Sequence, residues 1–335
     1  MIYSDFNLKP LNTFGLETKA KTLISIDNES DLIEINDTSL SERNLILGGG
    51  SNTVFVNDYF DGTILLIRNK GINLVHEDEE TVILDAFSGE VWNDVVSFCA
   101  EKGWWGIENL AAVHGNVGAV AVQNIGAYGA ELKECFVECL TYSPLKKEWK
   151  TYLNKDLDFG YRYSIFKNQK ELEIIWKVRL RLSKKMKIND SYAAIRDKII
   201  EENLIISSPL DMVNLVTKVR NSKLPDPRVL GNCGSFFKNP IVSESHFELL
   251  KKEYPSIPSY AAKDGVKLAA GWLIEQCGYK GKRIGNVGMH EKQALIMVNF
   301  GNAKGEEILN LAFEIEKSVK NIFNVELEKE VHIIL

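Results

Sequence analysis

The sequence predicts an α+β fold of about two domains, and three observations support this. Its 335 residues are about twice a common domain length of about 150. Segments with apolar residues at every second position, typical of strands, share the chain with segments of helical period. No run of about 18 consecutive apolar residues occurs, so we expect no membrane-spanning helix.

Short strands and glycine turns are expected in the first part of the chain. Asn44–Leu47 is a short apolar run that ends at three glycines. The other expected strands are Gly62–Ile67, Thr81–Ala86, Phe136–Ser143 and Leu172–Leu182. In the last of these, apolar residues alternate and predict a single apolar face: Ile174, Trp176, Val178, Leu180 and Leu182.

Four helices are expected from apolar residues that recur every three or four positions: Gly89–Ala100, Ser208–Arg220, Trp272–Cys277 and Gly305–Phe323. Pro225 and Pro227 block any helix that would continue past residue 223, so a domain boundary is expected there. The segment beyond it is a smaller α+β part, with strands expected at Ala294–Phe300 and Glu326–Ile334.

The charge and cysteine content exclude several classes of protein. With 40 Lys and Arg against 46 Asp and Glu the net charge is −6, which disfavours binding to a nucleic-acid backbone. The five cysteines form no C-x-x-C pair, so we expect reduced thiols in the cytoplasm. The amino-terminal residues have no apolar core of a secretory signal.

Common cofactor motifs are missing. The sequence has no G-x-G-x-x-G, P-loop or G-x-S-x-G pattern. Its five histidines are scattered and form no H-E-x-x-H motif, so no metal site is expected.

Two glycine-rich stretches could hold a ligand. In the first, a short strand runs into Gly48-Gly49-Gly50 and then Ser51-Asn52; such a run can point backbone N–H groups at a pyrophosphate, or it can be a plain tight turn. The second, residues 115–129, is long and almost uncharged. It suits either close approach of a flat ligand or tight packing in a core, and these residues alone do not separate the two.

The blocks that follow one another along the chain resemble the UDP-N-acetylenolpyruvoylglucosamine reductase (MurB) family. They run from residue 12 to residue 331: Asn12–Gly15, Leu47–Asn52, Gln123–Gly129, Gly160–Lys167, Lys223–Pro227, Gly231–Pro240, Ala270–Glu275 and Leu327–Val331. The resemblance implies an FAD-binding fold of the vanillyl-alcohol-oxidase (PCMH) type. It implies two FAD-binding subdomains, expected at 1–70 and 71–222, and a substrate-binding domain at 223–335.

The resemblance implies bound FAD, with NADPH as the co-substrate. The residues that match cofactor-binding positions are Gly48, Gly49, Gly50, Ser51, Asn52, Gly118, Gln123, Asn124, Ile125, Gly126, Tyr128 and Arg162. The implied reaction reduces UDP-N-acetylglucosamine enolpyruvate to UDP-N-acetylmuramate, a step of peptidoglycan precursor synthesis and hence of cell-wall formation, cell shape and division.

Three residues match the family's catalytic positions: Arg162, Ser235 and Glu330. An ionised carboxylate accepts further charge poorly, so the enolpyruvyl carboxylate needs a cation or a proton donor beside it. Arg162 can grip it with two N–H groups, and a protonated Glu330 could donate a hydrogen bond to the developing enolate. Ser235 matches the proton donor to the carbon that carries the ether oxygen, where position matters more than acidity.

Four further residues match substrate-binding positions. Lys223, Asn239 and Gln293 match donors to the diphosphate, and Tyr192 resembles the tyrosine that covers the substrate, in a loop expected at 185–207. Tyr163, or a shifted register, is the alternative to Tyr192. His114 and Lys329 stand where the family usually has proline, and we expect a looser loop and a looser strand there.

A monomer that binds only small molecules is expected. Two other functions remain open from the sequence: a different oxidase or dehydrogenase of the same flavin fold, and a flavin- or UDP-sugar-binding module without turnover. Cys233, beside Ser235, is expected to pack rather than react.

Overall fold

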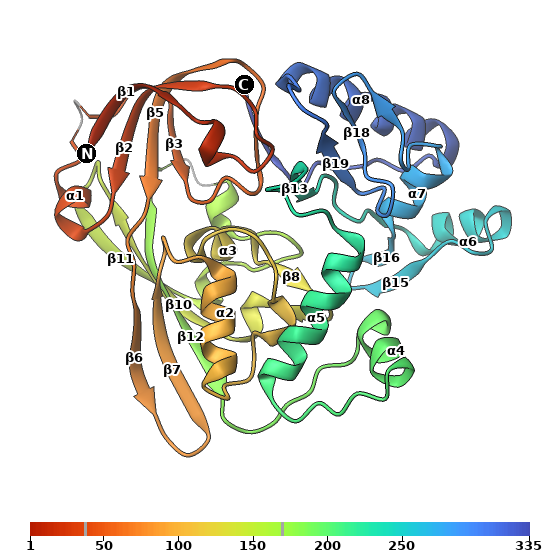
Figure 1. Ribbon diagram of the computed structural model, residues 1–335, viewed down its shortest axis with the longest axis horizontal. Coiled ribbons are helices and arrows are strands. Elements are labelled where there is room, and N and C mark those ends of the chain that lie inside the picture. The colour runs from red at the N-terminus through yellow and green to blue at the C-terminus, as the bar shows by residue number, and fades with distance from the viewer. Residues whose placement is uncertain (37–38, 169–170) are drawn as a thin grey trace. The chain divides into compact units, whose positions relative to one another are not determined.

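In the computed structural model, which describes residues 1–36, 39–168 and 171–335 (Figure 1), the chain forms two compact units. Unit 1 contains Met1–Phe6, Ala20–Gly49 and Asp61–Ser222. Unit 2 contains Asn7–Lys19, Gly50–Phe60 and Lys223–Leu335. The expected boundaries at 1–70, 71–222 and 223–335 stay a prediction, and unit 2 is made from three separate stretches of chain.

Unit 1 has a four-stranded sheet in the order β1-β2-β5-β3. Its strands are β1 (Ile2–Asn7), β2 (Lys19–Ile26), β5 (Tyr59–Ile67) and β3 (Asn44–Leu47). β3 runs parallel to β5, with Asn44 opposite Thr63. The short helix α1 (Glu29–Ile33) follows β2 and begins at a capping box formed by Asn28 and Asp31.

A five-stranded antiparallel sheet in the order β11-β10-β12-β7-β6 forms the rest of the framework of unit 1. Its strands are β6 (Ile72–Glu77), β7 (Thr81–Phe87), β10 (Phe136–Ser143), β11 (Glu148–Leu153) and β12 (Ile174–Ser183), and a small hairpin joins β8 (Gly126–Ala127) to β9 (Ala130–Glu131).

The prediction that the alternating apolar residues of β12 share one face is wrong. Val178, Leu180 and Leu182 pack into one core cluster, whereas Ile174 and Trp176 pack into another. A register shift against β10, where Leu140 faces Lys177 and Thr141 faces Ile175, leaves Trp176 as an extra residue. Such a bulge moves every later side chain to the other face.

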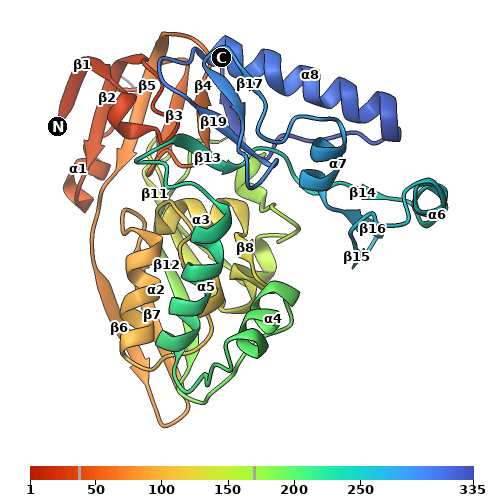
Figure 2. The same cartoon turned by 45° about the vertical axis from the view of Figure 1, so that its right-hand side comes forward.

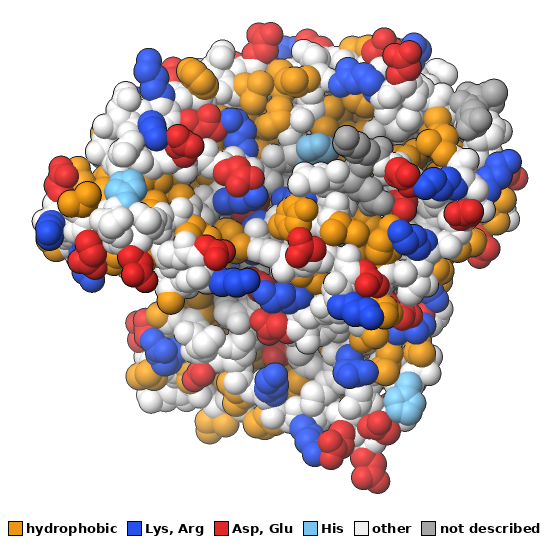
Figure 3. Space-filling view, turned by 180° about the vertical axis from the view of Figure 1, so that it is seen from behind, with side chains coloured by type: hydrophobic (Ala, Val, Ile, Leu, Met, Phe, Trp, Pro, Cys, Tyr) orange, Lys and Arg blue, Asp and Glu red, His pale blue; other side chains and the backbone are white. Residues whose placement is uncertain are grey.

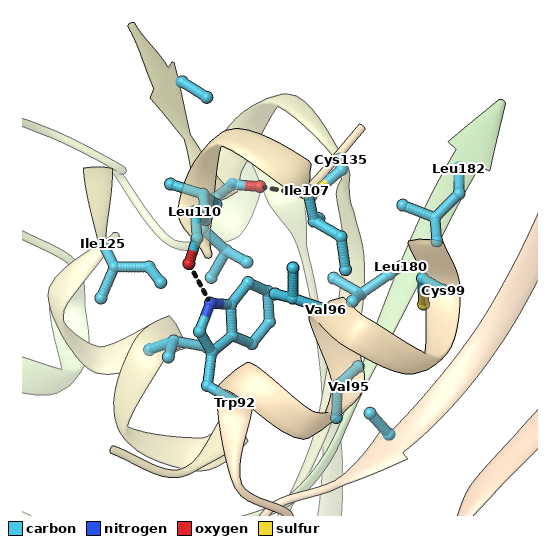
Figure 4. Packing of buried hydrophobic residues seen from close by; sticks show 14 of the residues in the cluster. Trp92, Val95, Val96, Cys99, Ile107, Leu110, Ile125, Cys135, Leu180 and Leu182 are labelled. Atoms are coloured by element: carbon cyan, nitrogen blue, oxygen red, sulfur yellow. Dashed lines mark hydrogen bonds between the residues drawn. The ribbon is translucent and has the colours of Figure 1, made fainter. Parts of the chain in front are cut away.

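Helices cover one face of this sheet (Figures 1 and 2). They are α2 (Trp92–Glu101), α3 (Val117–Gln123) and α5 (Pro209–Lys223). Unit 1 also contains α4 (Ala193–Glu201), which lies beside α5, and the single turns η2 (Glu108–Leu110), η3 (Leu132–Glu134), η4 (Asn154–Asp156) and η5 (Ile165–Lys167). Figure 4 shows the fully buried Trp92, whose indole N–H donates to the carbonyl of Leu110 at 3.0 Å. This bond allows a polar indole nitrogen to lie in the core.

Unit 2 has a sheet in the order β13-β19-β18-β17, a second in the order β14-β16-β15, and the pair β20-β4. Their strands are β4 (Thr53–Phe55), β13 (Gly231–Ser235), β14 (Ile241–Val242), β15 (Ser259–Ala262), β16 (Gly265–Leu268), β17 (Arg283–Ile284), β18 (Val287–Met289), β19 (Ile296–Asn299) and β20 (His332–Ile334). The helices are η1 (Lys9–Leu11), α6 (Glu244–Glu253), α7 (Ala270–Gln276) and α8 (Gly305–Phe323).

The long strand expected at Glu326–Ile334 is shorter in the structure. Backbone bonds from Lys238 to Glu328 and from Glu330 to Phe236 first pair this segment with residues 236–238. Only β20, from His332, pairs with β4, in parallel. The segment changes partner within a few residues, and this breaks the expected strand.

No helix within the described residues is both long and apolar enough to cross a membrane. On the face drawn in Figure 3, Lys and Arg side chains are interspersed with Asp and Glu side chains.

Candidate active site

Gly48 and Gly49 lie in unit 1, directly against Asn116. A Cβ atom on Gly49 would lie 2.7 Å from Asn116 Oδ1, and one on Gly48 would lie 3.3 Å from the Asn116 Cβ. The Asn116 amide is fixed in turn, because its Nδ2 donates to the carbonyl of Gly89 at 2.7 Å. Glycine is therefore needed here for the backbone to approach Asn116.

Gly118, in the first turn of α3, is a third glycine at which the backbone comes close to a neighbouring residue. A Cβ atom there would lie 2.9 Å from the Cβ of Ser88 and 3.0 Å from its Oγ. The Ser88 Oγ is buried, and it has no hydrogen-bond partner among the described residues. A buried hydroxyl without a partner calls for an explanation, and a phosphate or ribose oxygen of a dinucleotide would supply one.

The turn after α3 is held by its own side chains. Asn124 is fully buried and has φ 43°; its Nδ2 donates to the Gly160 carbonyl at 2.9 Å and its Oδ1 accepts from the Lys133 N–H at 3.0 Å. Ile125 packs into the core of unit 1. Of the predicted cofactor residues, these two have clear packing roles within the protein.

Arg162 stands at the tip of a tight turn beside Gly126. Gly160 and Tyr163 exchange backbone hydrogen bonds across this turn, and Arg162 has the left-handed φ of 55°. Its Nη2 donates to the Gly126 carbonyl at 2.6 Å, and the guanidinium carbon lies 5.0 Å from the ring centroid of Tyr161. A Cβ on Gly126 would lie 2.9 Å from Arg162 Nη1, so glycine leaves room for the guanidinium.

Tyr192, the predicted covering tyrosine, directly precedes α4 in unit 1. Its ring packs edge to face on Tyr128, with centroids 5.2 Å apart. Tyr128 has φ 48°. Burial raises the pKa of its hydroxyl, and Arg220 opposes this increase through its positive charge and a hydrogen bond. Gln123, the remaining predicted cofactor residue of unit 1, is half-buried at the end of α3.

Ser235 and Glu330 lie on paired segments of unit 2. The Glu330 N–H donates to the carbonyl of Phe236, the residue after Ser235, at 2.9 Å. Gly234 has φ 72°, and a Cβ added there would meet nothing within 4 Å. Cys233 is buried, and burial together with the charge of Glu330 raises the pKa of its thiol, which fits the expected packing role.

Gly50, Ser51 and Asn52 lie in unit 2, whereas Gly48 and Gly49 lie in unit 1. The predicted pyrophosphate loop is therefore divided between the units. Asn52 Nδ2 donates to the Glu330 carbonyl at 3.2 Å, and the His332 N–H donates to the Asn52 carbonyl at 2.8 Å. A predicted cofactor residue and a predicted catalytic residue are thus brought together.

Two predicted diphosphate ligands, Asn239 and Gln293, meet the first turn of α7. The backbone N–H of Ala270 donates to Asn239 Oδ1 at 2.9 Å, and that of Leu295 donates to Gln293 Oε1 at 3.3 Å. A Cβ on Gly271 would lie 2.6 Å from Gln293 Oε1. Since a backbone N–H only donates, these contacts fix which end of each amide is oxygen.

Lys223, the third predicted diphosphate ligand, is linked by hydrogen bonds of His290 to the segment that precedes Gln293. The ring of His290 forms a hydrogen bond with the backbone of Lys223, and its Nδ1 accepts from the Lys292 N–H at 3.4 Å. Burial lowers the pKa of His290. The pair of bonds links the Lys223 backbone to the residues just before Gln293.

Comparison with known proteins identifies the family. A family model for the UDP-N-acetylenolpyruvoylglucosamine reductase C-terminal domain matches residues 226–334, and one for an FAD binding domain matches residues 20–143. A UDP-N-acetylenolpyruvoylglucosamine reductase from Flavobacterium johnsoniae is 44% identical over 99% of both chains. One from Chromobacterium violaceum is 42% identical over 98% of this chain and 97% of its own. The chain belongs to the UDP-N-acetylenolpyruvoylglucosamine reductase family.

Solved structures of other proteins confirm the fold class. The reductase MurB from Thermus caldophilus matches 100% of this chain and 98% of its own with a TM-score of 0.67 and 20% identity. The 6-hydroxy-D-nicotine oxidase from Arthrobacter nicotinovorans matches 97% of this chain and 86% of its own with a TM-score of 0.52 and 11% identity. Both likenesses show the fold alone, since a shared fold does not fix the substrate.

Sequence reasoning did not single out Ser88 or Asn116. Asn116 precedes α3 within the glycine-rich stretch, and an asparagine between glycines is the signal that could have been followed. Ser88 carries no such signal, because a buried polar atom is recognised only when its surroundings are known.

Proposed function

We propose that this chain catalyses the NADPH-dependent, FAD-mediated reduction of UDP-N-acetylglucosamine enolpyruvate to UDP-N-acetylmuramate. The similarity to reductases of this family over 99% of the chain supports the proposal, and so does the pairing of the Ser235 and Glu330 segments. The reaction would serve peptidoglycan precursor synthesis, and so cell shape and division, in the cytoplasm, with small molecules as the only partners of a monomer.

The residues of unit 1 fit FAD. Gly48, Gly49 and Gly118 leave the backbone bare beside Asn116 and Ser88, and the buried Ser88 hydroxyl needs a partner. Gly50, Ser51 and Asn52, which also match cofactor-binding positions, belong to unit 2. Bound FAD supplies a carrier that takes a hydride from NADPH and delivers it to the enolpyruvyl methylene carbon.

Arg162 binds and polarises the enolpyruvyl carboxylate in this proposal. Its guanidinium is oriented by the Gly126 carbonyl and by the ring of Tyr161. A pre-oriented guanidinium costs little reorganisation when negative charge develops next to it. Two N–H groups on one planar fork also match the two oxygens of a carboxylate.

Ser235 provides the single proton that the reduction needs, and Glu330 provides a hydrogen bond. Ser235 donates a proton to the carbon that carries the ether oxygen, and Glu330, when protonated, donates a hydrogen bond to the developing enolate. The left-handed Gly234 leaves open space beside Ser235, where a substrate could approach. Lys223, Asn239 and Gln293 bind the diphosphate, and Tyr192 covers the substrate.

Anaerobic half-reactions on the purified yellow protein test the function. NADPH should bleach the flavin absorbance, and UDP-N-acetylglucosamine enolpyruvate should then restore it. Reoxidation by simple alcohol-derived carbonyl compounds, or turnover with oxygen without NADPH, would instead indicate another enzyme of this fold. A colourless protein would indicate that the chain does not bind a flavin.

Ser235→Ala tests the proton donor. The rate of flavin reduction by NADPH should be unchanged, because no proton to carbon is needed in that half-reaction. Reoxidation by the enolpyruvyl substrate should slow by about a hundredfold or more. A variant as fast as the wild type in both halves would remove Ser235 from the mechanism.

A further inference from the structure

Asn109, in η2, connects two segments of unit 1 that are far apart in the sequence. The residue is 1% exposed. Its Nδ2 donates to the carbonyl of Tyr128 at 2.8 Å and to the carbonyl of Asn189 at 2.8 Å. One amide group therefore holds both the turn between β8 and β9 and the segment that leads to Tyr192.

Asn189 and Ser191 reinforce this connection from the solvent side. Asn189 Nδ2 donates to the carbonyl of Gly129 at 3.0 Å, and the Ser191 hydroxyl donates to Asn189 Oδ1 at 2.6 Å. Gly129 has φ 84°, and a Cβ there would lie 2.4 Å from Ser191 Oγ. The segment 189–192 can approach the turn this closely only because residue 129 has no side chain.

The hairpin that contains this turn contacts two predicted functional residues. The carbonyl of Gly126, on β8, accepts from Arg162, and the ring of Tyr128, in the turn, packs on Tyr192. Tyr128 and Gly129 both have positive φ, so the shape of the turn is demanding and has to be held by contacts.

Asparagine at position 109 carries a cost in folding free energy. Its Oδ1 is buried and has no hydrogen-bond partner among the residues that the structure describes, which destabilises the fold relative to a satisfied or apolar group. An apolar side chain would avoid this cost, but it would leave the carbonyls of Tyr128 and Asn189 without this donor. What asparagine supplies at this position is therefore the link between the turn and the segment that leads to Tyr192.

We propose that Asn109 is a positioning residue for substrate binding. It acts through the 128–129 turn and the 189–192 segment, and it holds the ring of Tyr192 in place before the substrate arrives. This inference rests on the proposed function, in which Tyr192 covers the UDP-sugar. A preformed cover lowers the ordering cost of binding, so Asn109 affects the KM for this substrate rather than the reduction of the flavin.

Two variants and one matched control test the proposal. Asn109→Ala removes both donations at the buried end, and Asn189→Ala removes the bond to Gly129 at the solvent end. Asn73→Ala is the control, because Asn73 is exposed on the edge strand β6 of the same unit. The measurements are KM for UDP-N-acetylglucosamine enolpyruvate, the rate of anaerobic flavin reduction by NADPH, and amide hydrogen exchange of residues 187–192.

Both variants should raise KM about tenfold, which corresponds to about 1.4 kcal/mol, and should accelerate exchange at residues 187–192. Flavin content and the rate of flavin reduction should stay at the wild-type values, and Asn73→Ala should change nothing. If Asn109→Ala does not fold, Asn189→Ala alone decides.

An unchanged KM together with faster exchange would overturn the positioning role, since the segment would be loosened without effect on the substrate. An equal loss in both half-reactions would overturn it as well, because it would show a general structural role. If the wild-type reduced flavin is not reoxidised by the enolpyruvyl substrate at all, the proposed function itself fails, which the other two outcomes leave intact.

Discussion

Arg162 combines an unfavourable backbone with a well-ordered side chain. A non-glycine residue with φ 55° carries a cost of about 1–3 kcal/mol, and a glycine would remove it. The arginine is nevertheless held by Gly126 and Tyr161. Strain retained at a position with an oriented cation is typical of functional sites, and it agrees with the carboxylate-binding role proposed here.

Arg162→Lys should slow flavin reoxidation by the enolpyruvyl substrate by about a hundredfold. A lysine is a point charge without the planar fork, so it loses two-point contact with the carboxylate. Flavin reduction by NADPH should remain close to the wild-type rate. Stopped-flow absorbance measures both halves, and an equal decrease in the two would contradict the assigned role.

At Gly50, both the backbone conformation and a close neighbour disfavour any side chain. Gly50 has φ 59°, and a Cβ would lie 2.0 Å from the carbonyl oxygen of Leu11. Gly278, in the same unit, has φ 77° with nothing within 4 Å of an added Cβ, so it isolates the backbone strain. We expect Gly278→Ala to lower the free energy of unfolding by about 1 kcal/mol and Gly50→Ala to lower it by about 3 kcal/mol. Equal effects in denaturant titrations would show that the close approach to Leu11 does not matter.

Three strands of the large sheet are joined by a charged network. Asp85 on β7 is 3% exposed and accepts from Lys177 Nζ at 2.7 Å and from Arg179 Nε at 2.6 Å, while Arg179 Nη1 donates to Glu138 on β10 at 2.7 Å. Burial opposes the charge of Asp85, but the bonds to Arg179 and Lys177 outweigh it, so the pKa lies below the ordinary value. The ionised form therefore stabilises the fold.

Asp85→Asn should lower the free energy of unfolding at pH 7 by about 2 kcal/mol. The stability contributed by a carboxyl of lowered pKa is present above its unfolded pKa of about 3.9 and is lost as the pH falls through the folded value. The difference from wild type should therefore shrink below about pH 4. Glu138→Gln, which touches only Arg179 of this network, should cost less; a difference that grows in acid would contradict the assignment.

Elements with one uninterrupted pattern were predictable. Gly305–Phe323 is helix α8 as expected (Figure 2), because its apolar residues keep one helical period along the whole segment. Residues 326–334 change partner between the 236–238 segment and β4, and β12 bulges at Trp176. Nothing in an alternating sequence marks such a change, since it depends on strands that come from elsewhere in the chain.

In the candidate site, too, some features could be predicted from the sequence and others depend on tertiary contacts. Residue types at matching positions predicted Arg162, Ser235 and Glu330, and the structure shows how their neighbours hold them. The cap that Asn239 provides to Ala270 and the double donation of Asn109 depend on tertiary contacts. A single sequence gives no spacing from which such contacts could be derived.

The two units differ in how the chain builds them, and this predicts the behaviour of a fragment. Residues 223–335 lack β4, the partner of β20, and also Thr13, whose hydroxyl donates to the Asn232 carbonyl at 2.7 Å. We expect this fragment alone to show no cooperative unfolding transition by circular dichroism. Addition of peptides covering 7–19 and 50–60 should restore one; cooperative unfolding without them would show that the carboxy-terminal stretch is self-sufficient.

During biosynthesis the stretches 7–19 and 50–60 leave the ribosome long before residues 223–335 are made. Until translation reaches β20, the apolar side chains of β4 have no strand beside them. They are therefore exposed in the nascent chain, where they can cause aggregation. Assembly of unit 2 is thus one of the last events in making the protein. Agents that hold nascent chains soluble should therefore influence its yield more than that of a protein whose domains follow one another in order.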